Sequence, residues 1–129
     1  MKRLLFIAGS AAVFCTVVQA CPLPESALRE GAVQAAWTVE GPPITVGKLF
    51  AVEVQVCPAD AVLSRVDATM PEHQHGMNYR PRIQRVGAAQ DGRWRAEGLM
   101  FHMPGRWDLR LDVLVAGRTQ KLTDTVTLP

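Results

Sequence analysis

The feature that most constrains the fold of this chain is the alternation of apolar and polar residues in short segments. Between Arg106 and Val115 every second residue is a tryptophan, leucine or valine, and arginine or aspartate fills four of the five positions between them. Successive side chains of a β-strand point to opposite faces, so this pattern predicts a strand with one buried face. Glycine or proline separates seven such segments from one another. They are residues 33–40, 50–57, 62–70, 80–86, 93–102, 106–115 and 118–128.

About seven short strands at roughly ten-residue spacing predict an all-β fold, an antiparallel β-sandwich of two layers. Residues 21–129 are enough for one such domain with a single core, and we expect Trp37, Trp94 and Trp107 to lie in it. Residues 22–32 are predicted to be a lead-in with room for one helical turn. No amphipathic helix of useful length is expected.

Residues 1–20 have the three parts of a secretory signal peptide. Lys2 and Arg3 form a basic start, an apolar stretch covers residues 4–18, and Val18-Gln19-Ala20 fits a cleavage site. The apolar stretch is shorter than a membrane-spanning helix usually needs, so cleavage is favoured over an uncleaved anchor. We therefore expect an exported protein.

Without residues 1–20 the chain has a balanced charge. The whole sequence has 14 basic and 12 acidic residues, and residues 1–20 contain two of the basic residues and no acidic one, which leaves 12 of each. A neutral domain gives no reason to expect nucleic acid or an anionic membrane surface as a partner. Five arginines nevertheless cluster, and we interpret them as the solvated face of two neighbouring strands, with a partner-docking patch as the alternative. They are Arg80, Arg82, Arg85, Arg93 and Arg95.

Two of the three cysteines, Cys21 and Cys57, remain after the signal peptide takes Cys15 with it. An even number of cysteines in an oxidising compartment favours a Cys21–Cys57 disulfide, which would stabilise the fold by roughly 3–4 kcal/mol through loop closure. The alternative is that Val-Gln-Ala-Cys, residues 18–21, is a bacterial lipobox. Cys21 would then carry lipid and Cys57 would be unpaired, so cysteine parity favours the disulfide.

All three histidines, and every methionine except the first residue, fall between residues 70 and 103. They are His73, His75, His102, Met70, Met77, Met100 and Met103. Imidazole binds copper in both common oxidation states, and the thioether of methionine favours Cu(I). Side chains two apart on an extended segment point the same way, so His73 and His75 can face one ion. If this segment meets the strand end at residue 102, the sequence predicts a copper site.

We expect His73, His75 and His102 to bind the ion, with Met77 or Met103 as the soft ligand. Zinc would also accept three imidazoles, but it would leave the methionines without a role, so copper is favoured. Non-metal interpretations stay open. A His-x-His pair in a loop is often only solvated, and His102 fits a packed histidine at a strand end. The two remaining methionines, Met70 and Met100, fit the core pattern of their strands.

Two stretches resemble a known family. Residues 66–77 contain Met-Pro-Glu-His-Gln-His-Gly-Met, and residues 98–107 contain Phe-His-Met-Pro-Gly. With these signatures the chain resembles the YtkA-like family of small exported bacterial proteins over most of residues 33–116. The resemblance implies an immunoglobulin-like β-sandwich, and similar sandwiches among periplasmic copper carriers favour copper by analogy of fold. A blue-copper centre is not expected, because no cysteine stands near His102.

We therefore expect a periplasmic protein that binds or delivers copper, with a cuproenzyme or another envelope protein as its partner. The alternative is an interaction domain that binds no metal and docks on an envelope complex. Catalysis is not expected, because the Gly-x-Ser-x-Gly motif is absent and a disulfide-bonded Cys57 is no nucleophile. Glu72 could act as a base only at a metal site. The protein would sit on the membrane only if Cys21 carries lipid, as a membrane-anchored lipoprotein.

Overall fold

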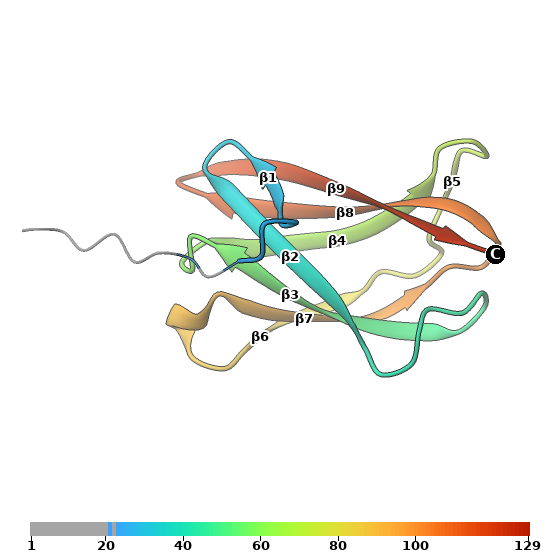
Figure 1. The fold of residues 1–129 in the computed structure, drawn as a ribbon, viewed down its shortest axis with the longest axis horizontal. Coiled ribbons are helices and arrows are strands. Elements are labelled where there is room, and N and C mark those ends of the chain that lie inside the picture. The colour runs from blue at the N-terminus through green and yellow to red at the C-terminus, as the bar shows by residue number, and fades with distance from the viewer. Residues whose placement is uncertain (1–20, 22) are drawn as a thin grey trace, which may run out of the picture.

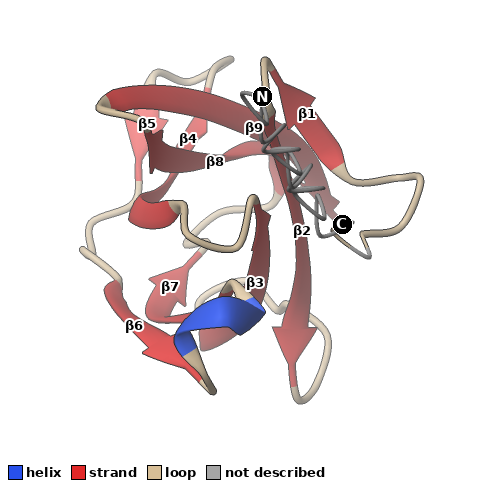
Figure 2. Ribbon diagram, turned by 90° about the vertical axis from the view of Figure 1, so that its left-hand side faces the viewer, coloured by secondary structure: helices blue, strands red, loops and turns tan. Residues whose placement is uncertain are grey.

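The computed structural model describes residues 21 and 23–129, and the predicted signal peptide, residues 1–20, lies outside them. The described residues form two antiparallel sheets that pack face to face. Figure 2 shows these layers, with β4 and β8 across the interior from β3 and β7. Within this part of the chain, no helix is long and apolar enough to cross a membrane.

The first sheet has five strands and the second has four. In spatial order, the first sheet consists of β1 (Leu28–Glu30), β2 (Val33–Glu40), β3 (Leu49–Cys57), β7 (Arg93–Met100) and β6 (Arg82–Val86). The second consists of β5 (His75–Gly76), β4 (Val62–Met70), β8 (Gly105–Val115) and β9 (Arg118–Leu128). A single turn of 3-10 helix, η1 (Ala89–Asp91), joins β6 to β7.

The predicted all-β sandwich is confirmed, and each of the seven predicted strands is present. Two further short strands occur among the described residues. β1 takes the place of the expected helical turn and pairs with β2 around Gly31, whose φ is 55°; β5 lies in a segment predicted to be a loop. Both depend on pairing with a distant or neighbouring strand, which local sequence preference does not reveal. An immunoglobulin-like strand arrangement stays a prediction.

The core lies between the sheets and contains two of the three expected tryptophans. Trp94 and Trp107 are buried, whereas Trp37 is partly buried and packs against the core. The indole Nε1 of Trp37 donates a hydrogen bond of 2.8 Å to Asp124 Oδ2. Asp124 interrupts the apolar row of β9, and this bond gives its carboxylate a partner there.

A bulge at Gly98 changes which side chains of β7 face the core. Ala51 pairs with Glu97 and Phe50 pairs with Leu99, so Gly98, at φ 87°, has no partner in β3. An extra residue reverses the inward and outward alternation beyond it. Leu99 is therefore fully buried, and the next residue, Met100, lies only partly buried on the opposite face. The prediction that Met100 is a core residue was wrong.

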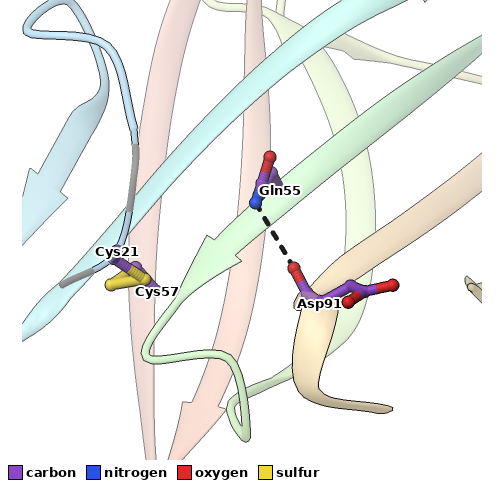
Figure 3. Close-up of a disulfide and its surroundings, with 4 residues drawn as sticks. All are labelled: Cys21, Gln55, Cys57 and Asp91. Carbon is purple, nitrogen blue, oxygen red and sulfur yellow. Dashed lines mark hydrogen bonds between the residues drawn. A yellow bond between two sulfur atoms is a disulfide. The ribbon is translucent and has the colours of Figure 1, made fainter. Parts of the chain in front are cut away.

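The two ends of the sandwich are built differently. At one end a disulfide joins Cys21 to Cys57, the last residue of β3, with Cα atoms 5.7 Å apart (Figure 3). Close by, Gln55 Nε2 donates to the carbonyl oxygen of Asp91 at 3.3 Å. The opposite end holds the turn between β4 and β5 and the connection between β7 and β8 (Figure 1).

Candidate metal centre

The predicted site residues come from two segments that meet at the end of the sandwich away from the disulfide (Figure 1). We call residues 71–77 the histidine hairpin and residues 101–104 the His102 loop. The hairpin reverses the chain after β4, and β5 then pairs back so that Met70 faces His75 across the strands. Residues directly opposite in an antiparallel pair share a face of the sheet, so His75 is on the same face as the buried Met70, although His75 itself is exposed.

The structure brings the three histidines side by side. The ring centres of His73 and His75 are 6.4 Å apart, and those of His75 and His102 are 6.1 Å apart. The first pair is roughly parallel, at 26°, and the second is nearly perpendicular, at 81°. His75 and His102, which β6, η1 and β7 separate in the sequence, thus present adjacent imidazoles.

The imidazoles do not yet surround a common point. Among residues 21 and 23–129, no three His, Cys, Asp or Glu side chains are placed to hold one metal ion as they stand. Two imidazoles bound to one tetrahedral ion, with metal–nitrogen distances of about 2.0–2.1 Å, have ring centres roughly 5 Å apart. The observed separations exceed this by about 1 Å, so all three rings must move closer together to share one ion.

The His102 loop is held from both sides. The backbone N–H of Gly47 donates to the carbonyl oxygen of Phe101 at 2.8 Å, and the indole Nε1 of Trp107 donates to the carbonyl oxygen of Met103 at 3.0 Å. The Phe101 and Trp107 rings stack with centres 4.8 Å apart, and the His102 ring stands edge-on to Trp107 at 5.3 Å. Trp107 is fully buried. It therefore positions His102 from within the core, a role that sequence reasoning missed.

The histidine hairpin is more exposed than the His102 loop. His73 and His75 are exposed, whereas His102 is half-buried. Besides the β4–β5 pairing, two backbone hydrogen bonds hold the hairpin, from His73 N–H to Met70 O at 3.2 Å and from Met77 N–H to Ala68 O at 3.1 Å. At its tip Gln74 has a φ of 53°, which few residues other than glycine adopt.

The hairpin has one ionic contact with β8. Glu72 Oε1 lies 3.7 Å from Arg106 Nε, and both side chains are exposed. An exposed ion pair contributes little to stability because water and salt screen it. Glu72 is thus occupied with Arg106, which gives no support to its use as a base.

The methionines divide into two groups. Met70 is buried as predicted, and its Cε lies where a Cβ on Gly105 would come within 3.0 Å. Met77 and Met103 are half-buried and pack against the edge of the core, one from the hairpin and one from the His102 loop. Each of the two segments therefore contributes one partly buried methionine in addition to its histidines.

The clustered arginines are largely neutralised by glutamates on the outer face of the first sheet. The ion pairs are Arg82–Glu97, Arg93–Glu53, Arg95–Glu40 and Arg95–Glu97, and Arg85 lies over the ring of Trp94. Hydrogen bonds from Arg95 and then Arg82 hold the pKa of Glu97 below its usual value. This pattern supports the interpretation of a solvated face. Within the described residues, Arg80 has no carboxylate partner.

A hollow of about 500 Å³ lies beside the histidine hairpin, and the sequence analysis did not predict it. Residues 64–67 of β4 form one wall, and residues 77–81 form the other. Met77 is one of the residues that line the hollow, and none of the three histidines is. Tyr79 is 48% exposed at its rim. Tyrosine and arginine are common anchors of protein interfaces, and their adjacency at 79–80 was the available signal.

Comparisons of the chain with protein-family models, with curated proteins and with solved structures find no significant match. The resemblance to the YtkA-like family therefore stays a prediction. Function has to be argued from the chemistry of the side chains themselves.

Proposed function

We propose that this protein binds copper in the bacterial periplasm and passes it to a cuproenzyme or another envelope protein. The ligands are His73, His75 and His102, with Met77 or Met103 as the soft partner. Copper is the cargo rather than a catalytic cofactor, and we assign the protein no catalytic step. The proposal is favoured over zinc because both half-buried thioethers would have no use at a zinc site.

The observation that carries the proposal is the row of three imidazoles at one end of the sandwich. His75 and His102 are 27 positions apart in sequence (102 minus 75), yet their ring centres are 6.1 Å apart. Solvated loop histidines have no need to gather in this way. A packed structural histidine explains His102, which contacts Trp107, but it does not explain two exposed imidazoles next to it.

A competition titration tests the proposal. Mature protein is titrated with Cu(I) against a coloured chelator, beside the His73→Ala/His75→Ala/His102→Ala variant. Gln74→Asn serves as a control, because asparagine tolerates the left-handed backbone of that position. We expect one Cu(I) per chain for the wild type and the control, and loss of that binding in the triple variant. Equal weak binding by all three proteins would refute the proposal.

Leucine variants identify the soft ligand. Met77→Leu and Met103→Leu keep the volume of the side chain and remove the sulfur. The variant that lowers the affinity for Cu(I) more strongly than that for Cu(II) marks the thioether that binds, because thioethers favour Cu(I).

The second candidate function is a metal-free interaction domain, and the hollow between β4 and residues 77–81 favours it. It predicts that Tyr79→Ala and Arg80→Ala abolish binding of an envelope partner while the histidine variants leave it intact. The copper proposal predicts the opposite: the histidine variants should impair binding of the partner more than Tyr79→Ala and Arg80→Ala do.

Export is part of the proposal, and the cysteine pairing supports it because disulfides persist in oxidising compartments. A lipid on Cys21 would occupy the sulfur that the structure joins to Cys57. Intact mass of the exported protein separates the two. A mass two hydrogens below the reduced chain is expected, and a diacylglyceryl addition would favour the lipoprotein.

A further inference from the structure

We infer that copper enters and leaves on the side of the histidine hairpin, while the His102 loop is the fixed half that retains the ion during exchange. This inference rests on the proposed function. It goes further by assigning an order to the ligands and a chemical class to the partner, namely a protein that presents a histidine, methionine or cysteine side chain.

The fixed half is arranged before copper arrives. Hydrogen bonds at the carbonyl oxygens of Phe101 and Met103, of 2.8 and 3.0 Å, bracket His102 on both sides. The buried Trp107 packs against the His102 ring, with the two ring centres 5.3 Å apart. A side chain already held by packing loses little freedom on binding, so more of its bond to the metal appears as affinity.

The hairpin half is arranged only in part. Its two imidazoles are exposed, and the His75 ring lies about 1 Å too far from His102 for a shared tetrahedral ion. Binding must therefore draw the hairpin toward the His102 loop and order its side chains. That ordering opposes binding, so the bonds from His73 and His75 are the weaker ones and break first.

Exchange can then proceed by replacement of one donor at a time. The partner's sulfur or imidazole nitrogen donates a lone pair to copper from the solvent side, and the bond from copper to His73 breaks. His73 leaves as neutral imidazole with its lone pair, and copper keeps its oxidation state. No electron moves. A histidine or methionine of the partner binds without proton transfer, whereas a cysteine releases its thiol proton to water as it becomes the thiolate ligand. His102 is the last ligand of this chain to be replaced. The hollow lined by Met77 gives an incoming side chain a second approach next to the hairpin.

Affinity and transfer rate distinguish the two halves. Protein loaded with one Cu(I) is mixed with excess bicinchoninate, a Cu(I) chelator, and transfer is followed by absorbance in a stopped-flow instrument. We compare wild type with His73→Ala, His102→Ala and the Gln74→Asn control. We expect His102→Ala to lower affinity about 100-fold, and His73→Ala to lower it only about tenfold, because of the unequal ordering cost. His73→Ala should also speed transfer by about tenfold, and Gln74→Asn should match the wild type.

Hydrogen exchange of the wild type gives a readout that needs no variant. On Cu(I) binding, the amide protons of His73 and Met77 should gain protection, because the hairpin closes. The amide of Gly47, already bonded to Phe101 at 2.8 Å, should not change. Equal affinity losses in the two histidine variants, or equal gains at Gly47 and in the hairpin, would overturn this inference. If the wild type binds no Cu(I), the proposed function fails instead.

Discussion

The two ends of the sandwich differ in what holds them together. At the disulfide end, a covalent bond links Cys21 to Cys57, and the backbone N–H of Val56 donates to Gly92 O at 2.8 Å. At the histidine end, polar side chains face solvent, and one of the two segments is joined to the sheet by the short β4–β5 pairing and two backbone hydrogen bonds of 3.1 and 3.2 Å. Binding sites are commonly drawn from the less stable parts of a fold. The contrast predicts that stability and metal chemistry can be changed separately.

The largest effect on stability is expected from removing the disulfide. Cys21→Ser/Cys57→Ser opens a loop that spans 36 positions, and we expect the free energy of unfolding to fall by about 3–4 kcal/mol. Urea denaturation measures this loss, and wild type under reducing conditions should show the same loss. The affinity for Cu(I) should not change, because the histidines lie at the other end. A loss of affinity for Cu(I) in this variant would show that the two ends of the sandwich are not independent.

A second effect at the disulfide end should come from Gly92. It has a φ of 65°, and a Cβ there would lie 2.5 Å from the carbonyl oxygen of Val56. Gly41 also has a positive φ, of 80°, but open space around it. We expect Gly41→Ala to cost about 1–2 kcal/mol from backbone strain alone, and Gly92→Ala to cost more because of the collision. Equal unfolding free energies for the two variants would show that the backbone at Gly92 shifts to accommodate a Cβ at no cost in stability.

A smaller, pH-dependent effect is expected on the outer face of β7. The pKa of Glu97 is lowered in the folded protein by Arg95 and Arg82, so its ion pairs contribute stability above the ordinary glutamate pKa of about 4.3. That contribution is lost as pH falls through the lower folded-state pKa. Unfolding of wild type and Glu97→Gln at a series of pH values checks the sign. The stability advantage of the wild type should shrink under acid and should also be weaker in high salt.

The smallest effect on stability should come from the candidate ligands. We expect the triple histidine-to-alanine variant to unfold within about 0.5 kcal/mol of the wild type, since these side chains are exposed or half-buried surface residues. Thermal and urea unfolding without copper measure this. A large loss of stability would mean that the imidazoles pack the end of the sandwich. Both ends of the sandwich would then stabilise the fold.

Alternation in the sequence was enough to predict the sandwich, because a strand with one buried face leaves a period-two pattern in its own residues. The alternation around Trp107 and Leu109 predicted β8 within one residue at its start. The same reasoning failed at Met100, because the bulge at Gly98 reverses the faces of the residues that follow it. It also did not reveal the hydrogen bond of Trp37, whose partner Asp124 lies 87 positions away.

For the candidate site, the sequence by itself determined which side chains could bind a soft metal, but the extended segment expected at His73 and His75 was wrong, because residues 71–74 form a turn with Gln74 at a φ of 53°. Only the tertiary structure decided that His75 meets His102, that Trp107 contacts His102, and that the other half is exposed. The physical reason is the difference between local and long-range interactions. Residue chemistry and strand periodicity are local properties of the chain, whereas the meeting of residues 75 and 102 depends on which strands pair and on how the two sheets pack.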